Sequence, residues 1–389
     1  MSRLVSLSYL NDYNLKNLEE SIKDAVASLE IANRVKPEMK VLIKANLPIG
    51  VSKDMAETTH PAVICALANW LTEMGAKCIV ADSPYKKYTP EFLEKVYLNT
   101  GILDTANKTN CELNRNMATF TCETPDGVMA KSLTLLEVIN DVDAIINVGK
   151  LKIDSSLGYM GAVSNLFGFV PGEVKTQVLN RLNTQKDFHN YCIDIYNVVK
   201  DKIIFNVIDG IVTKESGDMP RLLYCLGVAE NMFSLDACII DILGIGYKNT
   251  VLKQAKQREL FDFEKGYKTT KERIEKFQLP DYALHEFCDA SSLNKKLGNK
   301  KRYFKSHQRR PIVEVPKCKG CGVCSKICPT GAIVMRTDKN GELYAHIDYA
   351  KCIFCFKCHT ACPYSVIDVV VPSGHKKIMK EIDKQNEKV

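Results

Sequence analysis

The sequence contains no long hydrophobic run and no secretory signal. Its apolar stretches fall far short of the roughly 18 consecutive apolar residues that a membrane-spanning helix needs. The N-terminal segment reaches Asp12 and Asn14 before any long apolar core develops, which is unlike a signal peptide. These two absences predict a protein without a membrane span, located in the cytoplasm.

Motifs of several common enzyme classes are missing as well. No Walker A and no G-x-G-x-x-G sequence follows an expected strand, so no motif supports a nucleotide-binding fold. No G-x-S-x-G sequence of a serine hydrolase is present. No histidine has a partner at metal-ligand spacing. His60, which stands before Pro61, is more typical of a helix start than of a ligand or a base.

Cysteine, in contrast, is abundant. Of the sixteen cysteines, eight fall in two runs near the C-terminus. Both runs read C-x2-C-x2-C-x3-C-P, and the second begins 34 residues after the first. They comprise Cys318, Cys321, Cys324 and Cys328, followed by Pro329, and Cys352, Cys355, Cys358 and Cys362, followed by Pro363. This spacing is typical of bacterial ferredoxins with two [4Fe–4S] clusters, and it predicts such a domain over residues 311–372.

The spacing also predicts which thiolates share a cluster. Three closely spaced cysteines supply three corners of a cube, and the fourth corner must come from elsewhere because the chain cannot bend round to it. In two-cluster ferredoxins the fourth cysteine of each run binds the other cluster. We therefore expect a first cluster site of Cys318, Cys321, Cys324 and Cys362, and a second cluster site of Cys352, Cys355, Cys358 and Cys328. Zinc would need paired C-x2-C knuckles, and a disulfide framework would need a small secreted domain.

The two runs differ in the residues between their cysteines. Gly320 and Gly322 let the backbone lie close to sulfur in the first run, whereas Phe354 and Phe356 take these places in the second. Reduction adds negative charge, which a drier site resists. The second cluster site is therefore predicted to have the lower potential, unless Lys357 offsets the effect. The alternative is that both phenylalanines only fill the small core.

The other eight cysteines show no ligand spacing. They are Cys65, Cys78, Cys111, Cys122, Cys192, Cys225, Cys238 and Cys288. Several lie in apolar stretches, where a free thiol behaves as a small hydrophobic side chain. Such usage suits a reducing compartment. An extra metal site or redox pair formed by Cys111 and Cys122 stays open as an alternative.

The formal charge of +7 is a poor indicator of nucleic-acid binding. Each oxidised cube with its four thiolates carries about −2, so part of the positive charge compensates the clusters. Residues 295–310 contain eight Lys or Arg and no acid. Such a run can contact an acidic partner or nucleic acid, but its position just before the cluster region favours a solvated linker.

Residues 1–245 alternate between strand and helix patterns, which predicts an α/β domain with a mainly parallel sheet. Strands are expected at 40–46, 77–82, 143–148, 202–210 and 226–230. Helices are expected from Thr59-His60-Pro61 to Gly75, over the glycine-containing stretch 157–168, and near 234–243. Residues 246–294 look helical and charged, and between the cysteine runs Asn340-Gly341 predicts a hairpin.

Polar residues stand where the expected strands end. In open α/β sheets, ligands bind beyond the carboxyl ends of the strands. We expect catalytic roles for Lys44, Asp82, Lys150, Lys152 and Asp209, with Asn46, Ser83 and Asn147 beside them. Three lysines with two aspartates are suited to a carboxylate or a phosphate, with or without a metal. Each residue taken alone is equally typical of a loop or a helix cap.

Short motifs in this region follow one another in a recognisable order. They are Ile43-Lys-Ala-Asn-Leu-Pro48, Thr59-His-Pro61, Asp82-Ser-Pro84, Asp143-Ala-Ile-Ile-Asn-Val-Gly-Lys-Leu-Lys152, Ser164-Asn-Leu-Phe-Gly168 and Asp209-Gly210. Over residues 40–245 the chain resembles the domain of unknown function numbered 362, whose members with a C-terminal two-cluster ferredoxin are iron–sulfur centre proteins. Ile153 and Ser164 replace the family's usual histidine and lysine, and Ser216–Pro220 replaces a glycine-rich stretch. The chemistry of those positions is therefore altered here.

The sequence predicts four parts: the α/β domain at 1–245, a helical, basic connecting segment at 246–310, the ferredoxin domain at 311–372 and a charged tail at 373–389. The leading hypothesis is an iron–sulfur oxidoreductase in which the ferredoxin domain exchanges single electrons with an α/β site for a small anionic substrate. A second is an electron carrier whose α/β domain docks a redox partner protein. A third assigns nucleic-acid contact to the basic run around Lys300, Lys301 and Arg302. The sequence does not predict the oligomeric state.

Overall fold

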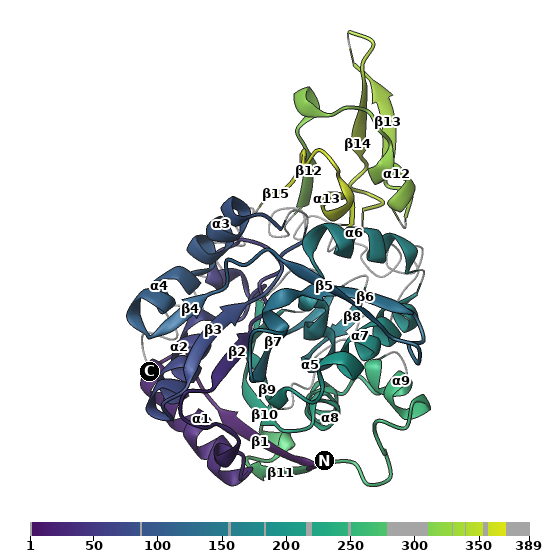
Figure 1. Cartoon of the computed structure of the whole chain (residues 1–389). Helices are drawn as coiled ribbons and strands as arrows, with labels where there is room; N and C mark the ends of the chain where they lie inside the picture. Colours follow the sequence, from purple (N-terminus) through teal and green to yellow (C-terminus); the bar gives the residue numbers. More distant parts are fainter. Residues whose placement is uncertain are drawn as a thin grey trace.

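The computed structural model describes residues 2–85, 88–154, 157–182, 184–214, 220–247, 250–277, 310–328, 330–338, 340–352 and 357–370. These residues form an α/β unit over 2–277 and a smaller ferredoxin-like unit over 310–370 (Figure 1). The expected fold class, a mainly parallel α/β domain followed by an α+β ferredoxin-like domain, is confirmed. None of the helices in these ranges is both long and apolar enough to cross a membrane.

A nine-stranded sheet of described residues forms the centre of the α/β unit. Its order is β11-β1-β10-β9-β7-β2-β3-β4, with β8 paired to β7. The strands are β1 (Leu4–Tyr9), β2 (Lys40–Lys44), β3 (Lys77–Ala81), β4 (Cys111–Leu113), β7 (Ala144–Asp154), β8 (Gly158–Met160), β9 (Ile203–Lys214), β10 (Pro220–Ala229) and β11 (Lys268–Lys271). The five strands from β9 to β4 run parallel, whereas β10 is antiparallel to β9 and β1. β5 (Thr119–Glu123) and β6 (Ser132–Leu136) form a separate hairpin.

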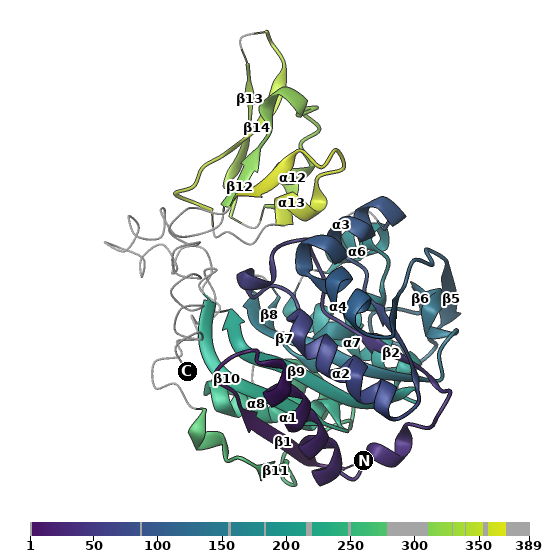
Figure 2. The ribbon, with the colours of Figure 1, turned by 90° about the vertical axis from the view of Figure 1, so that its left-hand side faces the viewer.

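Helices cover both faces of the sheet (Figures 1 and 2). One group is α1 (Leu15–Ser28), α2 (Pro61–Glu73), α3 (Pro90–Thr100) and α4 (Ile102–Lys108); the other includes α5 (Ala162–Asn165), α7 (Gln185–Val199), α8 (Met232–Leu243) and α9 (Val251–Gln257). The chain leaves β2 toward β3 on one side and leaves β7 toward β9 on the other. The neighbours β2 and β7 therefore flank the point where the strand order reverses, where open α/β sheets bind ligands.

Local sequence explains the long central strands and the helix after β2. All twelve residues of β9 and the first ten of β7 are buried, as expected for strands covered on both faces. Pro61 starts α2 at a position where its missing N–H costs nothing, and the His60 Nδ1 accepts the Ala62 N–H at 3.2 Å. Gly75, with φ of 73°, ends this helix as predicted.

The predicted helix over 157–168 is wrong in part. β8 turns back along β7 before the short helix α5 and the 3-10 turn η4 (Leu166–Phe169). Gly158 has a φ of 84°, which a helix does not contain, and at Gly161 a Cβ atom would collide with Asp236 and Tyr159. Gly158 therefore allows the chain to turn back along β7, and Gly161 allows close packing against Asp236 and Tyr159, so the segment does not form one continuous helix.

The α/β unit continues past residue 245, where the sequence predicted a separate connecting segment. β11 pairs in parallel with β1 from Leu4↔Lys268 to Leu7↔Lys271 and so adds a strand to the main sheet. The basic run at 295–310 lies outside the described residues except for Arg310. The replaced glycine-rich stretch also lies outside them, apart from Pro220.

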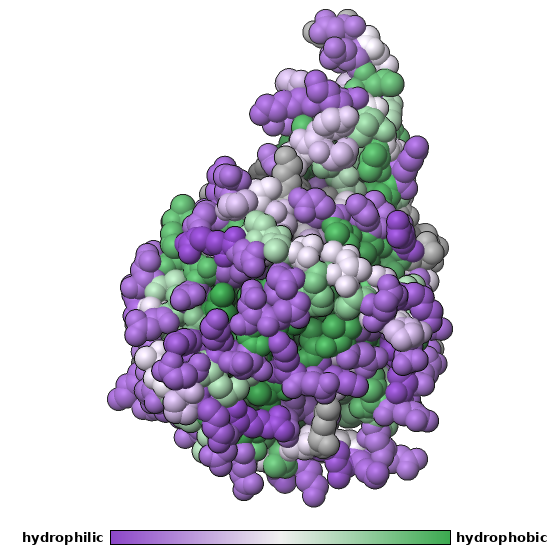
Figure 3. Space-filling model, in the orientation of Figure 1, coloured by the Kyte–Doolittle hydropathy of each residue, from purple (hydrophilic) through white to green (hydrophobic). Residues whose placement is uncertain are grey.

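The ferredoxin-like unit consists of two antiparallel strand pairs and two short helices. They are β12 (Arg310–Val313) with β15 (Ile367–Val370), β13 (Ile333–Thr337) with β14 (Leu343–Ile347), α12 (Val323–Ile327) and α13 (Lys357–Ala361). The predicted hairpin joins β13 to β14 and contains Gly341 at a φ of 82°. Hydrophobic surface lies along this hairpin, where Val334 and Leu343 are exposed (Figure 3).

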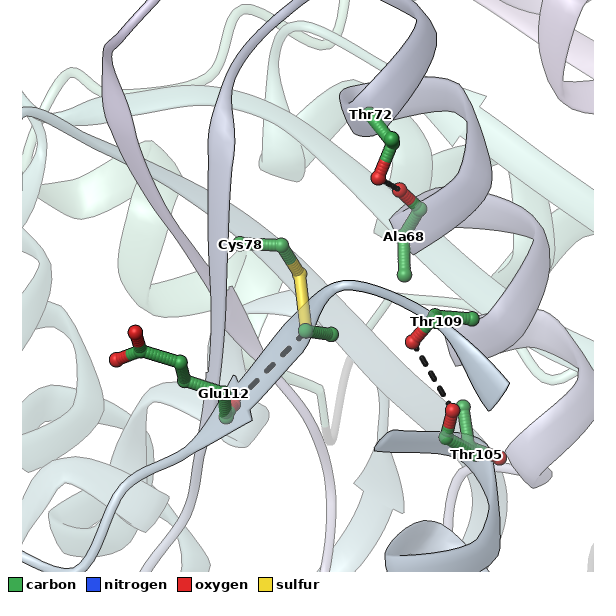
Figure 4. Close-up of a disulfide and its surroundings, with 7 residues drawn as sticks. Ala68, Thr72, Cys78, Thr105, Thr109 and Glu112 are labelled. Atoms are coloured by element: carbon green, nitrogen blue, oxygen red, sulfur yellow. Dashed lines mark hydrogen bonds between the residues drawn. A yellow bond between two sulfur atoms is a disulfide. The ribbon is translucent and has the colours of Figure 1, made fainter. Parts of the chain in front are cut away.

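A disulfide joins two neighbouring strands of the α/β unit. Cys78 of β3 and Cys111 of β4 are partners in the strand register and are bonded through their sulfur atoms (Figure 4). The expectation that both thiols are free is therefore wrong, and Cys111 is not paired with Cys122. The pattern gave no sign of the bond because the two cysteines meet only through the sheet register. The bond fastens β4, a three-residue edge strand, to the sheet.

Candidate functional site

Four cysteines from both runs line one pocket in the ferredoxin-like unit. They are Cys318, Cys321, Cys324 and Cys362, the four residues expected at the first cluster site. Apolar side chains complete the wall, among them Met335, Ala345, Val366 and Ile367. Four thiols around an apolar pocket are the donor set that a [4Fe–4S] cube requires. The residues present therefore fit a cluster.

The loop of the first run depends on glycine. Gly320 and Gly322 have φ values of 61° and 72°, a region that favours glycine. A Cβ atom on Gly320 would lie 2.6 Å from the Leu343 carbonyl oxygen, so the loop packs directly against the hairpin. Burial raises the pKa of Cys324 to about 11, and the neighbouring thiols of Cys318, Cys321 and Cys362 add to the shift. A bound metal would offset this effect because it stabilises the thiolate.

Three of the four cysteines expected at the second cluster site are among the described residues. Cys358 is buried in α13, and Cys328 and Cys352 pack against the same small core. The Ala332 backbone N–H donates to the Cys328 Sγ at 3.2 Å. Hydrogen bonds of this kind tune a cluster's potential. Cys355, Phe354 and Phe356 lie outside the described residues.

In the α/β unit, buried lysines and carboxylates meet at the ends of β2 and β3 and within the C-terminal halves of β7 and β9. β7 and β9 continue to Asp154 and Lys214, past the ends predicted at 148 and 210. Lys44 ends β2 and Asp82 follows β3, and the Lys44 Nζ lies 2.8 Å from the Asp82 Oδ1. Both side chains are almost fully buried. Gly168 packs so closely that a Cβ atom there would collide with both. Burial lowers the pKa of Lys44, and Asp82 partly opposes this.

A second pair lies one strand further along the sheet. Lys150 of β7 and Asp209 of β9 are register partners, and their side chains form an ion pair of 2.9 Å. The Tyr13 hydroxyl donates to the Asp209 Oδ1 at 2.8 Å and accepts from the Lys150 Nζ at 2.9 Å. The His60 backbone N–H donates to the Asp209 Oδ2 at 3.0 Å, and its ring stacks on Tyr13 with centroids 3.6 Å apart. Burial and then Lys150 hold the pKa of His60 well below its usual value.

Two further lysines converge on one carboxylate. Lys152 of β7 and Lys214 of β9 are register partners, and both reach Glu57. The Lys152 Nζ also donates to the Glu57 carbonyl at 2.9 Å and to the Asn46 Oδ1 at 3.3 Å. Burial lowers the pKa of Lys152 to about 7, and the positive charge of Lys214 contributes.

Four asparagines form a hydrogen-bonded chain from the end of β2 to β9. Asn46 donates to Asn165 at 2.9 Å, Asn165 donates to Asn147 at 2.8 Å, and Asn147 donates to Asn206 at 3.0 Å. Asn147 and Asn206 are register partners on β7 and β9. Satisfied buried amide chains of this kind fix side-chain positions. Asn46 and Lys152 are thereby held in place.

One buried lysine has no carboxylate partner among the described residues. Lys175 lies on α6 (Gly172–Arg181) and is 2% exposed. Its Nζ donates to the Ser83 carbonyl oxygen and lies 5.3 Å from the centroid of the Tyr85 ring and 5.8 Å from that of Phe167. Burial lowers its pKa to about 7; Asp82 opposes this effect and Lys44 adds to it.

The family assignment follows from a comparison with known proteins. The family described as a domain of unknown function (DUF362) matches residues 41–241, just over half of the chain. The chain belongs to the DUF362 family. A 4Fe-4S dicluster domain matches residues 317–366, C-terminal to the DUF362 region and over both cysteine runs.

Individual relatives match one part or the other. A thylakoid-associated protein of Synechocystis is 29% identical over 251 residues, which cover 62% of this chain and 75% of that protein. An uncharacterized ferredoxin of Methanocaldococcus jannaschii is 39% identical over 66 residues, or 17% of this chain and 84% of the relative. The pyruvate synthase subunit PorD of that organism is 41% identical over 61 residues, which cover 16% of this chain and 66% of that subunit. The ferredoxin matches support an iron–sulfur electron-transfer role for this DUF362 protein.

The structure brings together most of the expected site residues and adds others. The strand-end site, as we call it, comprises the expected Lys44, Asp82, Lys150, Lys152 and Asp209 with Tyr13, Glu57, Lys175 and Lys214. Lys214 is the last residue of β9, and the apolar residues Ile211 and Val212 before it could have shown that this strand continues to Lys214. Tyr13 and Glu57 lie in loops, and Lys175 lies on a helix with an ordinary polar pattern, so no local signal marked them.

Two positions differ from the residues that are usual in the family. Ile153 is buried, and the Ser164 Oγ accepts the Gly161 N–H at 2.7 Å.

Proposed function

We propose that this DUF362 protein is an iron–sulfur redox protein whose two [4Fe–4S] clusters serve the strand-end site. In this proposal the ferredoxin-like unit passes single electrons to or from a small anionic substrate held in the α/β unit. The four-cysteine pocket is the observation that carries the redox part, since it combines thiols from both runs. We also propose that the protein is located in the cytoplasm.

The residues of each cluster site have separate tasks. At the first cluster site the loop around Gly320 and Gly322 lets three thiols face one pocket, and Cys362 closes it from the second run. When bound, each cluster takes up and releases one electron at a time. At the second cluster site we assign Cys352, Cys355, Cys358 and Cys328 as ligands. The exchange of fourth ligands would hold the two clusters close together.

The strand-end site supports the substrate part of the proposal. Its lysines are buried where the order of the strands reverses. Burying a charge is unfavourable, so buried lysines at a strand end are more typical of a binding or catalytic site than of a stabilising core. Lys152 and Lys175 have pKa values of about 7 and so can exchange protons near neutral pH. Amines of this kind suit a small carboxylate or phosphate that is reduced or oxidised with proton transfer.

The test begins with anaerobic purification and analysis of iron and inorganic sulfide. We expect about eight of each per chain, from two four-iron clusters with four-thiolate ligation. The reduced protein is then mixed with small acids, and the rate of cluster reoxidation is followed by absorbance. An effective acid should lose its effect in Lys150→Met and Lys152→Met but keep it in Lys23→Met, which changes an exposed lysine. Absence of iron, or an undiminished effect in both site variants, contradicts the proposal.

One observation favours a second candidate, a non-enzymatic electron carrier whose α/β unit docks a protein partner. Lys44 and Lys150 already have their own buried carboxylates, Asp82 and Asp209. Charges that neutralise each other leave less need for an external anion. If no small acid alters reoxidation but a cell extract protein does, this candidate replaces the substrate proposal.

A further inference from the structure

One helix of the α/β unit approaches both functional regions. Cα atoms of α6 lie within 8 Å of Cα atoms of α13, and both views of the chain show these helices next to each other (Figures 1 and 2). α13 contains Cys358 and is followed directly by Cys362. On its inner side α6 places Lys175 against the Ser83 carbonyl, one residue after Asp82. This ten-residue helix therefore contacts the ferredoxin-like unit and, through Lys175, the strand-end site.

Cys362 of the first cluster site directly follows α13, but the rest of its pocket extends along the β13–β14 hairpin. The pocket of the first cluster site includes Met335 of β13 and Ala345 of β14. That hairpin points away from the α/β unit in both views (Figures 1 and 2). Cys321 of this pocket is exposed to solvent. Cys358 of the second cluster site, in contrast, is buried in the helix that meets α6.

We propose that the two clusters act in a fixed order and that α6 is the electron-relay helix. The first cluster site faces outward and exchanges electrons with an external one-electron carrier protein. The second cluster site faces α6 and exchanges them with the strand-end site. Each transfer moves one electron, so the group that gives it is oxidised by one unit and the group that receives it is reduced by one. This inference rests on the proposed function, because it assigns a route to the electrons that function requires.

Lys175 has a defined place in this route. It lies on α6, the helix that contacts α13, and its Nζ reaches the Ser83 carbonyl oxygen next to Asp82. The ring centroids of Tyr85 and Phe167 lie 5.3 and 5.8 Å from this amine. A cation in a dry environment stabilises negative charge more strongly than the same cation in water. We assign Lys175 as a positioning residue that holds the Ser83 loop and favours arrival of an electron near it.

The experiment measures how each cluster affects a spin label on α6. A nitroxide is introduced as a non-natural amino acid at Gln177, an exposed position of α6, in the full-length, cluster-loaded protein. A matched control carries it at Lys16, an exposed position of α1 at the opposite end of the molecule (Figure 1). On reduction with dithionite we expect several-fold faster relaxation at position 177 and no change at position 16.

Two variants decide which cluster the label senses. Cys321→Ser alters the first cluster site and should leave the relaxation enhancement at position 177 in place, whereas Cys358→Ser should abolish it. If Cys358→Ser fails to fold, Cys328→Ser, which removes another ligand assigned to the second cluster site, takes its place and should likewise abolish the enhancement. Reduced-cluster signals without enhancement at position 177, or loss of the enhancement in Cys321→Ser, overturn the inference. Absence of any reduced-cluster signal instead contradicts the proposed function.

Discussion

Lys152 and Lys214, on neighbouring strands, both donate to the single carboxylate of Glu57. All three side chains are at most 10% exposed. Two buried ammonium groups that share one carboxylate repel each other, and this repulsion contributes to the low pKa of Lys152. Removing the charge of any one of these three side chains therefore changes the electrostatic interactions of the other two.

Removing the charge of Glu57 tests this relationship. Glu57→Gln keeps the shape of the side chain but leaves the buried amines without the carboxylate that they share. We expect the free energy of unfolding to fall by about 3–5 kcal/mol. Denaturant unfolding followed by fluorescence of Trp70, the single tryptophan and a buried residue of α2, reports on the α/β unit.

The matched control for Glu57 is Glu73→Gln. Glu73 pairs with Lys23 on the surface, where both side chains are about half exposed. Exposed pairs contribute at most about 1 kcal/mol, so this variant should change stability little. Equal losses in the two variants would show that Glu57 acts as an ordinary surface carboxylate.

Stability should depend on pH through Lys175. Its pKa is about 7 in the folded protein, whereas a lysine in an unfolded chain titrates near 10.4. Between these values the unfolded chain binds more protons than the folded protein, so the free energy of unfolding rises with pH. Lys175→Met should reduce this slope by up to about 1.4 kcal/mol per pH unit between about pH 7 and pH 10. Unfolding titrations at several pH values measure it.

The control for Lys175 is Lys16→Met, which changes an exposed lysine and should leave the slope as it is. Part of the slope should also remain in Lys175→Met, because Lys152 has a similarly low pKa. An unchanged slope in Lys175→Met would mean that this amine stays protonated in the folded protein.

Breaking the disulfide should weaken the edge of the sheet. The bond between Cys78 and Cys111 closes a loop with a sequence separation of 33 residues. Its loss should lower the free energy of unfolding by about 2–4 kcal/mol. A Cys78→Ala, Cys111→Ala double variant should unfold at lower denaturant and should no longer respond to a thiol reductant. Cys65→Ala removes a free thiol of α2 and should still respond. A reductant that leaves the unsubstituted protein unchanged contradicts the prediction.

Exchange of the fourth ligands predicts a pattern of cluster losses. Cys362→Ser should disturb the same cluster as Cys318→Ser, although the two residues belong to different runs, because both line one pocket. Cys328→Ser should disturb the other cluster. Electron paramagnetic resonance of the reduced variants separates the two signals. If Cys362→Ser and Cys352→Ser instead lose the same signal, each run binds its own cluster.

The sequence predicted cluster cysteines from their local spacing, and four of them line one pocket. Three thiols that are two residues apart meet by the geometry of one turn, and the repeat pointed to the exchange with Cys362. It also predicted that Lys150 and Asp209 lie near each other, because both stand at the carboxyl ends of the expected parallel strands. The structure places both inside longer strands. Here the strand register, which sequence patterns do not specify, decided that these two would pair.

Other parts of the site could not be predicted from local patterns. Tyr13 and Glu57 reach the strand ends from loops whose position depends on the whole fold. No helix was predicted around Lys175, and its burial follows from how α6 packs on the Ser83–Tyr85 segment. The stretch over 157–168 has helical periodicity, yet packing around Gly161 required a reversal there.

The partnership of β11 with β1 means that the family boundary is not the folding boundary. A fragment that stops at residue 241, where the DUF362 match ends, lacks β11 and leaves the outer rim of β1 open. Bare backbone donors and acceptors along a rim invite strands of other molecules to add on. A fragment meant to isolate the α/β unit should therefore run to residue 277, so that β1 stays paired and the edge is instead β11, a four-residue strand with two lysines, Lys268 and Lys271. Short, charged edge strands resist the addition of other strands.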